Sequence, residues 1–160
     1  MTDLLPLLQE FYDEKLASMQ RHTSGARVVT QYDANNAYQY IINREETQLS
    51  WLAQAIVELD GEVPAPAADQ SKDEQAAAGM RAVMEQDARD AQQFVDRWRP
   101  RVDGMANARH RRMLNVILGE TLEQKRSFEQ ALAGRRDLLG RRTEDVGLLV
   151  GEVLPTRWIE

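Results

Sequence analysis

Four long stretches of the chain repeat apolar residues at intervals of three and four positions, and this spacing is the strongest constraint on the fold. Such a repeat lines one face of an α-helix, and no stretch shows the strict apolar/polar alternation of a half-buried strand. The expected helices cover residues 2–20, 33–59, 71–99 and 107–132. The sequence therefore predicts an all-α protein. The second stretch, about 40 Å long at ~1.5 Å per residue, favours a bundle.

Local signals set the expected ends of these helices. Ser24 and the glycine after it mark the exit of the first helix, and Asp33 is a candidate cap for the second. Ser71 and Glu74 have the spacing of a capping box at the start of the third helix, which Pro100 is expected to end. The fourth helix is followed by a glycine, a common signal for a helix end.

The connection at residues 61–70 bears on the topology. Its sequence, GEVPAPAADQ, contains two prolines, which favour an extended path of ~3.1 Å per residue, or about 31 Å in all. That length nearly matches a bundle, so the second and third helices can run in the same direction. We therefore expect two antiparallel helical hairpins joined by one long crossover, the arrangement of ferritin-like four-helix bundles. The alternative is a loose surface loop between ordinary up-down neighbours.

We expect residues 1–142 to form the bundle and residues 143–160 to form a short C-terminal helix or tail. The segment 147–160 is apolar for a chain end and carries Trp158. Apolar chain ends usually dock, here on the bundle or on the second copy of a homodimer. If exposed, this tail would be a surface for a protein partner.

Composition excludes several classes of function. The net charge of −6 is spread through the chain and leaves no basic stripe for nucleic acid. With no cysteine and only two histidines, the chain has almost no sulfur or nitrogen ligands, which excludes zinc-finger, iron–sulfur and thiol chemistry. No phosphate-binding loop, dinucleotide fingerprint or esterase motif occurs. The longest strongly apolar run, residues 146–150, is too short to span a bilayer. We expect a cytoplasmic protein without a nucleic-acid or membrane partner.

Polar side chains interrupt the apolar faces of the helices at roughly mid-height. Glu45 and Gln48 share the inward face of the second helix. Burying an unpaired carboxylate costs several kcal/mol at least, so a cluster of them requires cations, positive side chains, shared protons or water. One interpretation is a metal site. The other is that the carboxylates reach solvent or are neutralised by Lys15 and a nearby arginine. The candidate ligands are Glu14, Glu45, Gln48, Asp87, Glu120 and Gln124.

The segment REETQLSWLAQAIVELDGEVP, residues 44–64, resembles the second helix of rubrerythrin-type ferritin-like proteins. There an E-x-x-H motif is followed by an apolar run and a glycine-containing turn, and the resemblance extends as a pattern over all four expected helices. In such families a glutamate from each of two helices and an E-x-x-H pair from each of the other two hold a di-iron centre. The resemblance implies a ferritin-like bundle with a di-metal centre of iron or manganese that turns over peroxide or oxygen.

The chain departs from that motif at both histidine positions. Glu45 occupies the carboxylate position, but Gln48 stands where the histidine is expected. In the fourth helix Thr121 and Gln124 take the places of the second pair, and Glu120 is one residue out of register. An amide oxygen is a much weaker ligand for iron than imidazole. What the resemblance implies is therefore a degenerate site.

We expect neither histidine to repair this site. His22 falls at the expected end of the first helix, and His110 precedes Glu120 by about 15 Å of helix. Both are expected at helix ends or on the surface. Gly119 is expected to allow a close contact or a one-residue bulge that re-aims Glu120.

Three hypotheses about function follow. In the first, the protein has a degenerate metal site, no cofactor and a non-catalytic structural or binding role. In the second, the carboxylates still hold iron or manganese and the protein is a di-metal oxidoreductase. In the third, the protein is a helical partner-binding module that acts through its C-terminal tail.

Overall fold

The structure is a computed structural model that describes residues 3–67, 75, 77–135 and 138. Within these ranges the regular structure is helical, with no strand. The long helices are α1 (Leu4–Ala26), α2 (Tyr32–Glu58), α4 (Met80–Asp103) and α5 (Ala108–Leu132). The prediction of an all-α, four-helix protein is confirmed. None of the helices in these ranges combines the length and apolarity that crossing a bilayer requires.

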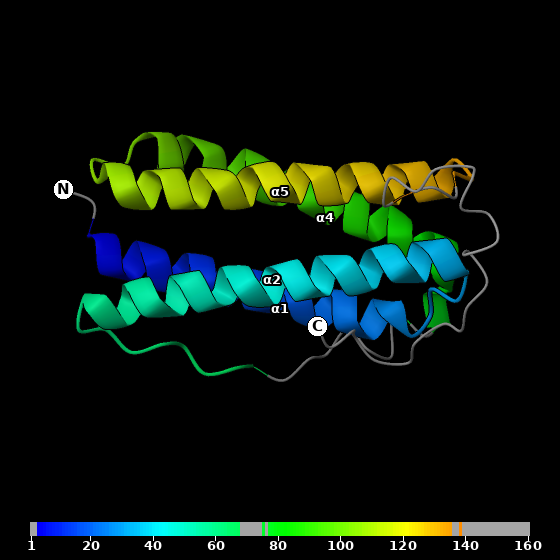
Figure 1. The fold of residues 1–160 in the computed structure, drawn as a ribbon, viewed down its shortest axis with the longest axis horizontal. Helices are drawn as coiled ribbons and strands as arrows, with labels where there is room; N and C mark the ends of the chain where they lie inside the picture. The colour runs from blue at the N-terminus through cyan, green and yellow to red at the C-terminus, as the bar shows by residue number, and fades with distance from the viewer. Residues whose placement is uncertain (1–2, 68–74, 76, 136–137, 139–160) are drawn as a thin grey trace, which may run out of the picture.

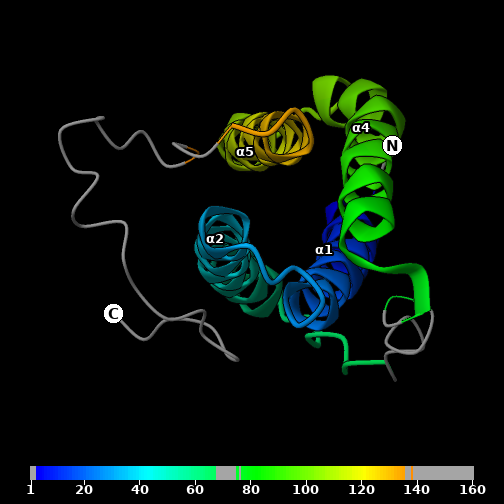
Figure 2. The ribbon, with the colours of Figure 1, turned by 90° about the vertical axis from the view of Figure 1, so that its right-hand side faces the viewer.

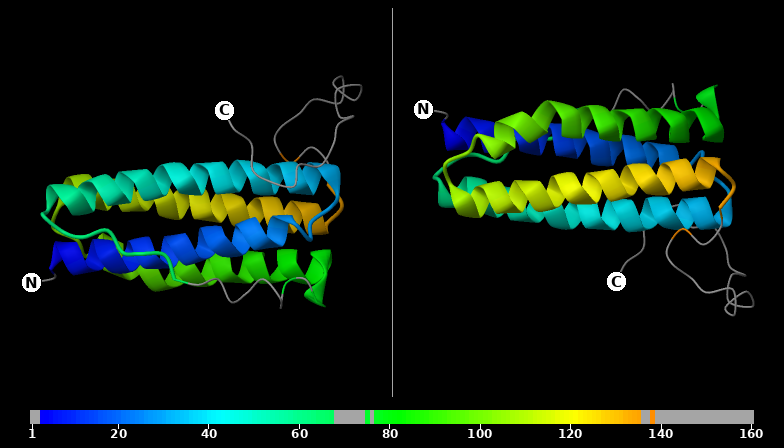
Figure 3. Two further views of the ribbon diagram at one scale, coloured as in Figure 1. Left: turned by 90° about the horizontal axis from the view of Figure 1, so that it is seen from below. Right: turned by 90° about the horizontal axis from the view of Figure 1, so that it is seen from above.

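The four helices lie side by side as two antiparallel hairpins (Figure 1). α1 pairs with α2 and α4 pairs with α5, while α2 and α4 run in the same direction (Figure 3). Seen along the bundle, α2 and α4 occupy opposite corners, as do α1 and α5 (Figure 2). Each helix of one hairpin therefore has one neighbour in the other hairpin.

The described part of the connection after α2 is extended along α1. The Gln9 side-chain amide donates to the Glu62 carbonyl at 2.9 Å, and the Gln20 amide donates to the Ala67 carbonyl at 3.2 Å. From Gln9 to Gln20 a helix rises ~16 Å, and from Glu62 to Ala67 an extended chain covers about the same length. The connection thus runs as a strap, as its prolines favour.

The first helix is longer than expected, because it continues through Ser24 and Gly25 to Ala26. Both residues weaken an isolated helix, but here they are buried. A methyl group on Gly25 would lie 3.0 Å from a Val83 side-chain carbon, so the glycine lets α4 approach. Tertiary packing therefore overrides the local signal.

Two further helix ends differ from expectation. The side chain of Gln31, not Asp33, caps α2 by accepting from the Ala34 N–H at 2.7 Å, and Asp33 lies in the first turn. Pro100 lies inside α4, which continues to Asp103. A proline this close to a helix end removes a single backbone hydrogen bond, and burial of Val102 keeps the last turn packed. Ser71, Glu74 and the predicted helix and tail at 143–160 lie outside the described residues.

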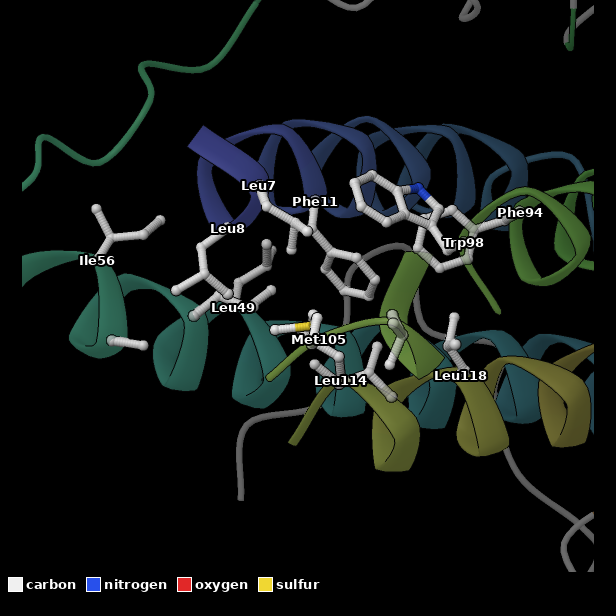
Figure 4. Packing of buried hydrophobic residues seen from close by; sticks show 14 of the residues in the cluster. Leu7, Leu8, Phe11, Leu49, Ile56, Phe94, Trp98, Met105, Leu114 and Leu118 are labelled. Atoms are coloured by element: carbon white, nitrogen blue, oxygen red, sulfur yellow. The ribbon is translucent and has the colours of Figure 1, made fainter. Parts of the chain in front are cut away.

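The apolar interior forms two clusters. In one, Phe11 of α1 makes edge contacts with Phe94 and Trp98 of α4, at ring-centroid distances of 5.2 and 4.9 Å (Figure 4). In the other, Tyr38 of α2 lies 5.1 Å from the ring of Phe128 of α5. Between these clusters all four helices contribute buried polar side chains, a set we call the polar layer: Lys15, His22, Glu45, Gln48, Asp87, Thr121 and Gln124.

Candidate functional site

The centre of the polar layer is an ion cluster of Lys15, His22 and Glu45, all nearly inaccessible to solvent. The Lys15 ammonium lies 3.2 Å from one Glu45 carboxylate oxygen. His22 Nδ1 donates to the other oxygen at 2.5 Å. Lys15 and His22 are seven residues apart, two turns of α1, so both reach the same carboxylate on α2.

The protonation of this cluster follows from its pairing. Burial alone would raise the pKa of Glu45, but His22 and Lys15 outweigh it and hold the pKa below its usual value. Burial likewise favours neutral His22, yet the Glu45 carboxylate raises the histidine pKa above its usual value. The geometry therefore favours an ionised Glu45 held by two cations.

Asp87 of α4 is buried close to this cluster and bonds to a different helix. It accepts a hydrogen bond from the Tyr38 hydroxyl of α2, which lies diagonally across the bundle. Burial raises the pKa of Asp87 despite the attraction of His22. The pKa of Tyr38 is raised well above its usual value by burial and by Asp87, so the phenol keeps its proton and acts as the donor.

Two other candidate ligands lie at the edges of the bundle, with side chains about 30% exposed. Glu120 binds the Arg44 guanidinium at 2.6 Å and also accepts from the Gln48 amide. Glu14 binds Arg97 at 2.8 Å and accepts from the Trp98 indole. Each of these carboxylates thus has a guanidinium and a neutral donor as partners.

The structure buries four of the six predicted ligands in the polar layer, namely Glu45, Gln48, Asp87 and Gln124. The two carboxylates among them, those of Glu45 and Asp87, are nevertheless bonded to separate partners. In the described ranges no three His, Cys, Asp or Glu side chains gather as a group that could hold a metal ion. Neutralisation by Lys15, the second interpretation of the sequence, is realised at Glu45.

Neither histidine lies on the surface, although His110 does lie at a helix end, as expected. His22 is 3% exposed, because α1 continues past it and Glu45 accepts a hydrogen bond from its Nδ1–H. The seven-residue spacing between Lys15 and His22, two helical turns, is the feature of the sequence that could have indicated that both lie on the same buried face. His110 is also largely buried, near the start of α5, where burial lowers its pKa. Gly119 causes no bulge: α5 runs through it unbroken, and nothing lies near its missing side chain.

A cleft between α1 and α4 leads from the surface to the polar layer. Its volume is about 420 Å³. Its inner wall includes His22 of α1 and Thr121 and Gln124 of α5, whereas Arg21 and Arg97 line its outer part. The cleft gives small molecules a path to His22.

Comparison of the chain with profiles of known protein families, with curated protein sequences and with solved structures finds no match.

Proposed function

We propose that this protein is a ferritin-like bundle in which side-chain cations replace the metal of a di-metal centre, and that it has a non-catalytic binding role. The observation that carries the proposal is the Lys15 ammonium 3.2 Å from the buried Glu45 carboxylate. Glu45 is the residue that occupies the carboxylate position of the E-x-x-H motif. A lysine there supplies the positive charge that the carboxylate needs.

Electrostatics support this assignment. A divalent cation at Glu45 would lie close to the Lys15 ammonium, and two like charges in a dry interior repel strongly. It would also compete with His22, whose Nδ1 already donates to Glu45. Asp87 and Glu120 cannot help without giving up their bonds to Tyr38 and Arg44.

The ferritin-like assignment is supported by the directions of the helices and by the position of the polar layer along the bundle. In the described ranges, α1 and α5 run one way and α2 and α4 the other, with a strap between the hairpins. Ferritin-like di-metal proteins place their ligands between the four helices, and here Glu45 lies between two apolar clusters.

Metal content tests the proposal. Protein purified without chelator is expected to contain far less than one iron or manganese ion per chain and to show no turnover of iron(II) with peroxide. Lys15→Glu serves as the matched variant, because it exchanges the cation for a second carboxylate beside Glu45. We expect added Mn²⁺ to raise the melting temperature of this variant and to leave the wild type unchanged.

Two metal ions per wild-type chain, with turnover lost in Glu45→Ala, would instead establish the di-metal oxidoreductase. The homodimer and the docking of the C-terminal tail stay predictions. Light scattering of the full chain measures the homodimer, and a loss of the dimer in a chain lacking residues 147–160 would show that the tail docks on the second copy.

A further inference from the structure

Two polar side chains that line the cleft between α1 and α4 have polar atoms for which the described residues provide no hydrogen bond. Gln124 is only 5% exposed and lines the cleft, yet its amide makes no hydrogen bond to the described part of the protein. His22 also lines the cleft. Its Nδ1 bonds to Glu45, which leaves Nε2 as the nitrogen without a partner among the described residues. Polar groups that line a cleft in this way are satisfied by water or by a ligand.

Protonated His22 is the charged group at the inner end of the cleft. Lys15, Glu45 and Asp87 do not line the cleft, and the two carboxylates balance Lys15 and the protonated histidine. At the rim the charges cancel, because Arg21 pairs with Asp90 at 3.6 Å and Arg97 pairs with Glu14 at 2.8 Å. An anion at the inner end of the cleft therefore has a cationic donor, His22, as its nearest charged neighbour.

The remaining lining sets the size and polarity of an occupant. Ala17, Ala91 and Phe94 provide apolar surface on both neighbouring helices. The Thr121 hydroxyl donates to the Ile117 carbonyl at 2.8 Å, so toward the cleft it can only accept. A volume of about 420 Å³ lies in the range of small-molecule sites.

We propose that this cleft binds a small carboxylate with a short apolar chain, the carboxylate taking hydrogen bonds from His22 Nε2 and the Gln124 amide. The apolar chain lies against Phe94 and the two alanines. This inference deepens the proposed binding role and rests on it, because the metal-free centre is what leaves His22 facing the cleft.

A titration of isotope-labelled protein with butyrate at constant ionic strength tests the proposal. We expect saturable NMR shifts at the Gln124 side-chain amide and the His22 ring. Butyramide, which has the same shape without the charge, is expected to bind at least tenfold more weakly. Equal affinity for butyrate and butyramide, phosphate binding at the same signals without butyrate binding, or no saturable shift would overturn the proposal.

Two variants locate the site. Gln124→Leu keeps the volume but removes the amide, and we expect at least tenfold weaker butyrate binding. Ala17→Trp, at an exposed position in the cleft lining, is expected to block entry and leaves the interior intact. Gln54→Leu, an exposed glutamine on α2, is the control and should bind as the wild type does. Unchanged affinity in both cleft variants would overturn the proposal.

The pH dependence separates this site from nonspecific binding. His22 is faced by Lys15 on its own helix, Glu45 and Tyr38 on α2, and Asp87 on α4, while its neighbours on α5 are uncharged. Protonated His22 attracts the carboxylate, so affinity should fall as the pH rises through the histidine pKa. His22→Gln should abolish this fall, and a fall that persists in the variant would contradict the assignment. Metal content is measured separately, so failure here leaves the metal-free centre intact.

Discussion

A carboxylate as deeply buried as Glu45 is stable in the bundle only because Lys15 and His22 on the next helix reach it. The sequence shows that a charged residue lies on an apolar face, and it therefore identifies Glu45, Gln48 and Gln124 as inward-facing. It does not show which partner each one takes, because that depends on the rotation and height of the neighbouring helices. For this reason the sequence does not predict the hydrogen bond between His22 and Glu45.

Removing the shared carboxylate should be costly, and removing Lys15 together with it should cost less. We expect Glu45→Gln to lower the free energy of unfolding by about 3–5 kcal/mol, because it leaves Lys15 and His22 buried without their counterion. Lys15→Met should cost less than that, because His22 still pairs with Glu45. The double variant, Lys15→Met with Glu45→Gln, should be more stable than Glu45→Gln alone. Urea unfolding measures all three, and additive losses in the double variant would show that the two groups do not interact.

The two histidines should give stability a maximum near pH 6.5. The pKa of His22 is raised in the folded state, so its contribution is complete below the unfolded pKa and is lost as the pH rises through the folded value. The pKa of His110 is lowered, so its contribution is present above about pH 6.5 and is lost as the pH falls.

Thermal unfolding from pH 5.5 to 8.5 measures this dependence. Replacing His22 by Gln should remove the loss on the alkaline side, whereas replacing His110 by Gln should remove the loss between pH 6.5 and 5.5. A wild-type profile that rises steadily up to pH 8.5 would contradict the proposed protonation of His22.

At the scale of the helices, local signals predicted some ends and failed at others. The start of α5 lies where the sequence predicts it, and there Asn107 caps the helix by accepting from the His110 N–H at 3.0 Å. Ser24 and Pro100 are equally clear local signals, yet both lie inside helices. The difference is burial. Packing of Gly25 and Val102 against other helices stabilises an extra turn that the isolated segment would lose.

Replacing two glycines by alanine, one inside α5 and one just after its end, should change the stability of the protein in opposite directions. Gly119 has helical geometry and open space around its missing side chain, so Gly119→Ala should stabilise the protein by about 0.5–1 kcal/mol. Gly134 follows the helix with a φ of +86°, which an alanine adopts at a cost, so Gly134→Ala should destabilise by about 1–2 kcal/mol. Chemical denaturation of the two variants measures both changes. A loss of stability in Gly119→Ala would contradict the open space around this position.

At the scale of the whole molecule, polar contacts link the two hairpins. The bond from Tyr38 to Asp87 joins α2 to α4, and Arg44 joins α2 to α5 through Glu120. On the other side, Glu10 and Glu14 of α1 pair with arginines of α4. Apolar periodicity predicts that helices pack together, but these pairings fix their relative positions.

Loss of the Tyr38 hydroxyl tests one of these links. Tyr38→Phe keeps the ring against Phe128 but leaves Asp87 buried without its donor, so we expect a loss of about 1–3 kcal/mol at neutral pH. The loss should shrink at acid pH, where Asp87 is protonated in the folded state. Tyr40→Phe, two residues away and 47% exposed, is the matched control and should change stability little. Equal effects of the two substitutions would argue against the link.

Gln124 has one more consequence for the architecture. It lines the cleft between α1 and α4, and it also lines a second cleft between α2 and α5 that contains Tyr40 and Arg44. The same side chain is therefore within reach of solvent spaces on opposite flanks of the molecule. Shortening it should enlarge both recesses toward one another at the same level of the bundle.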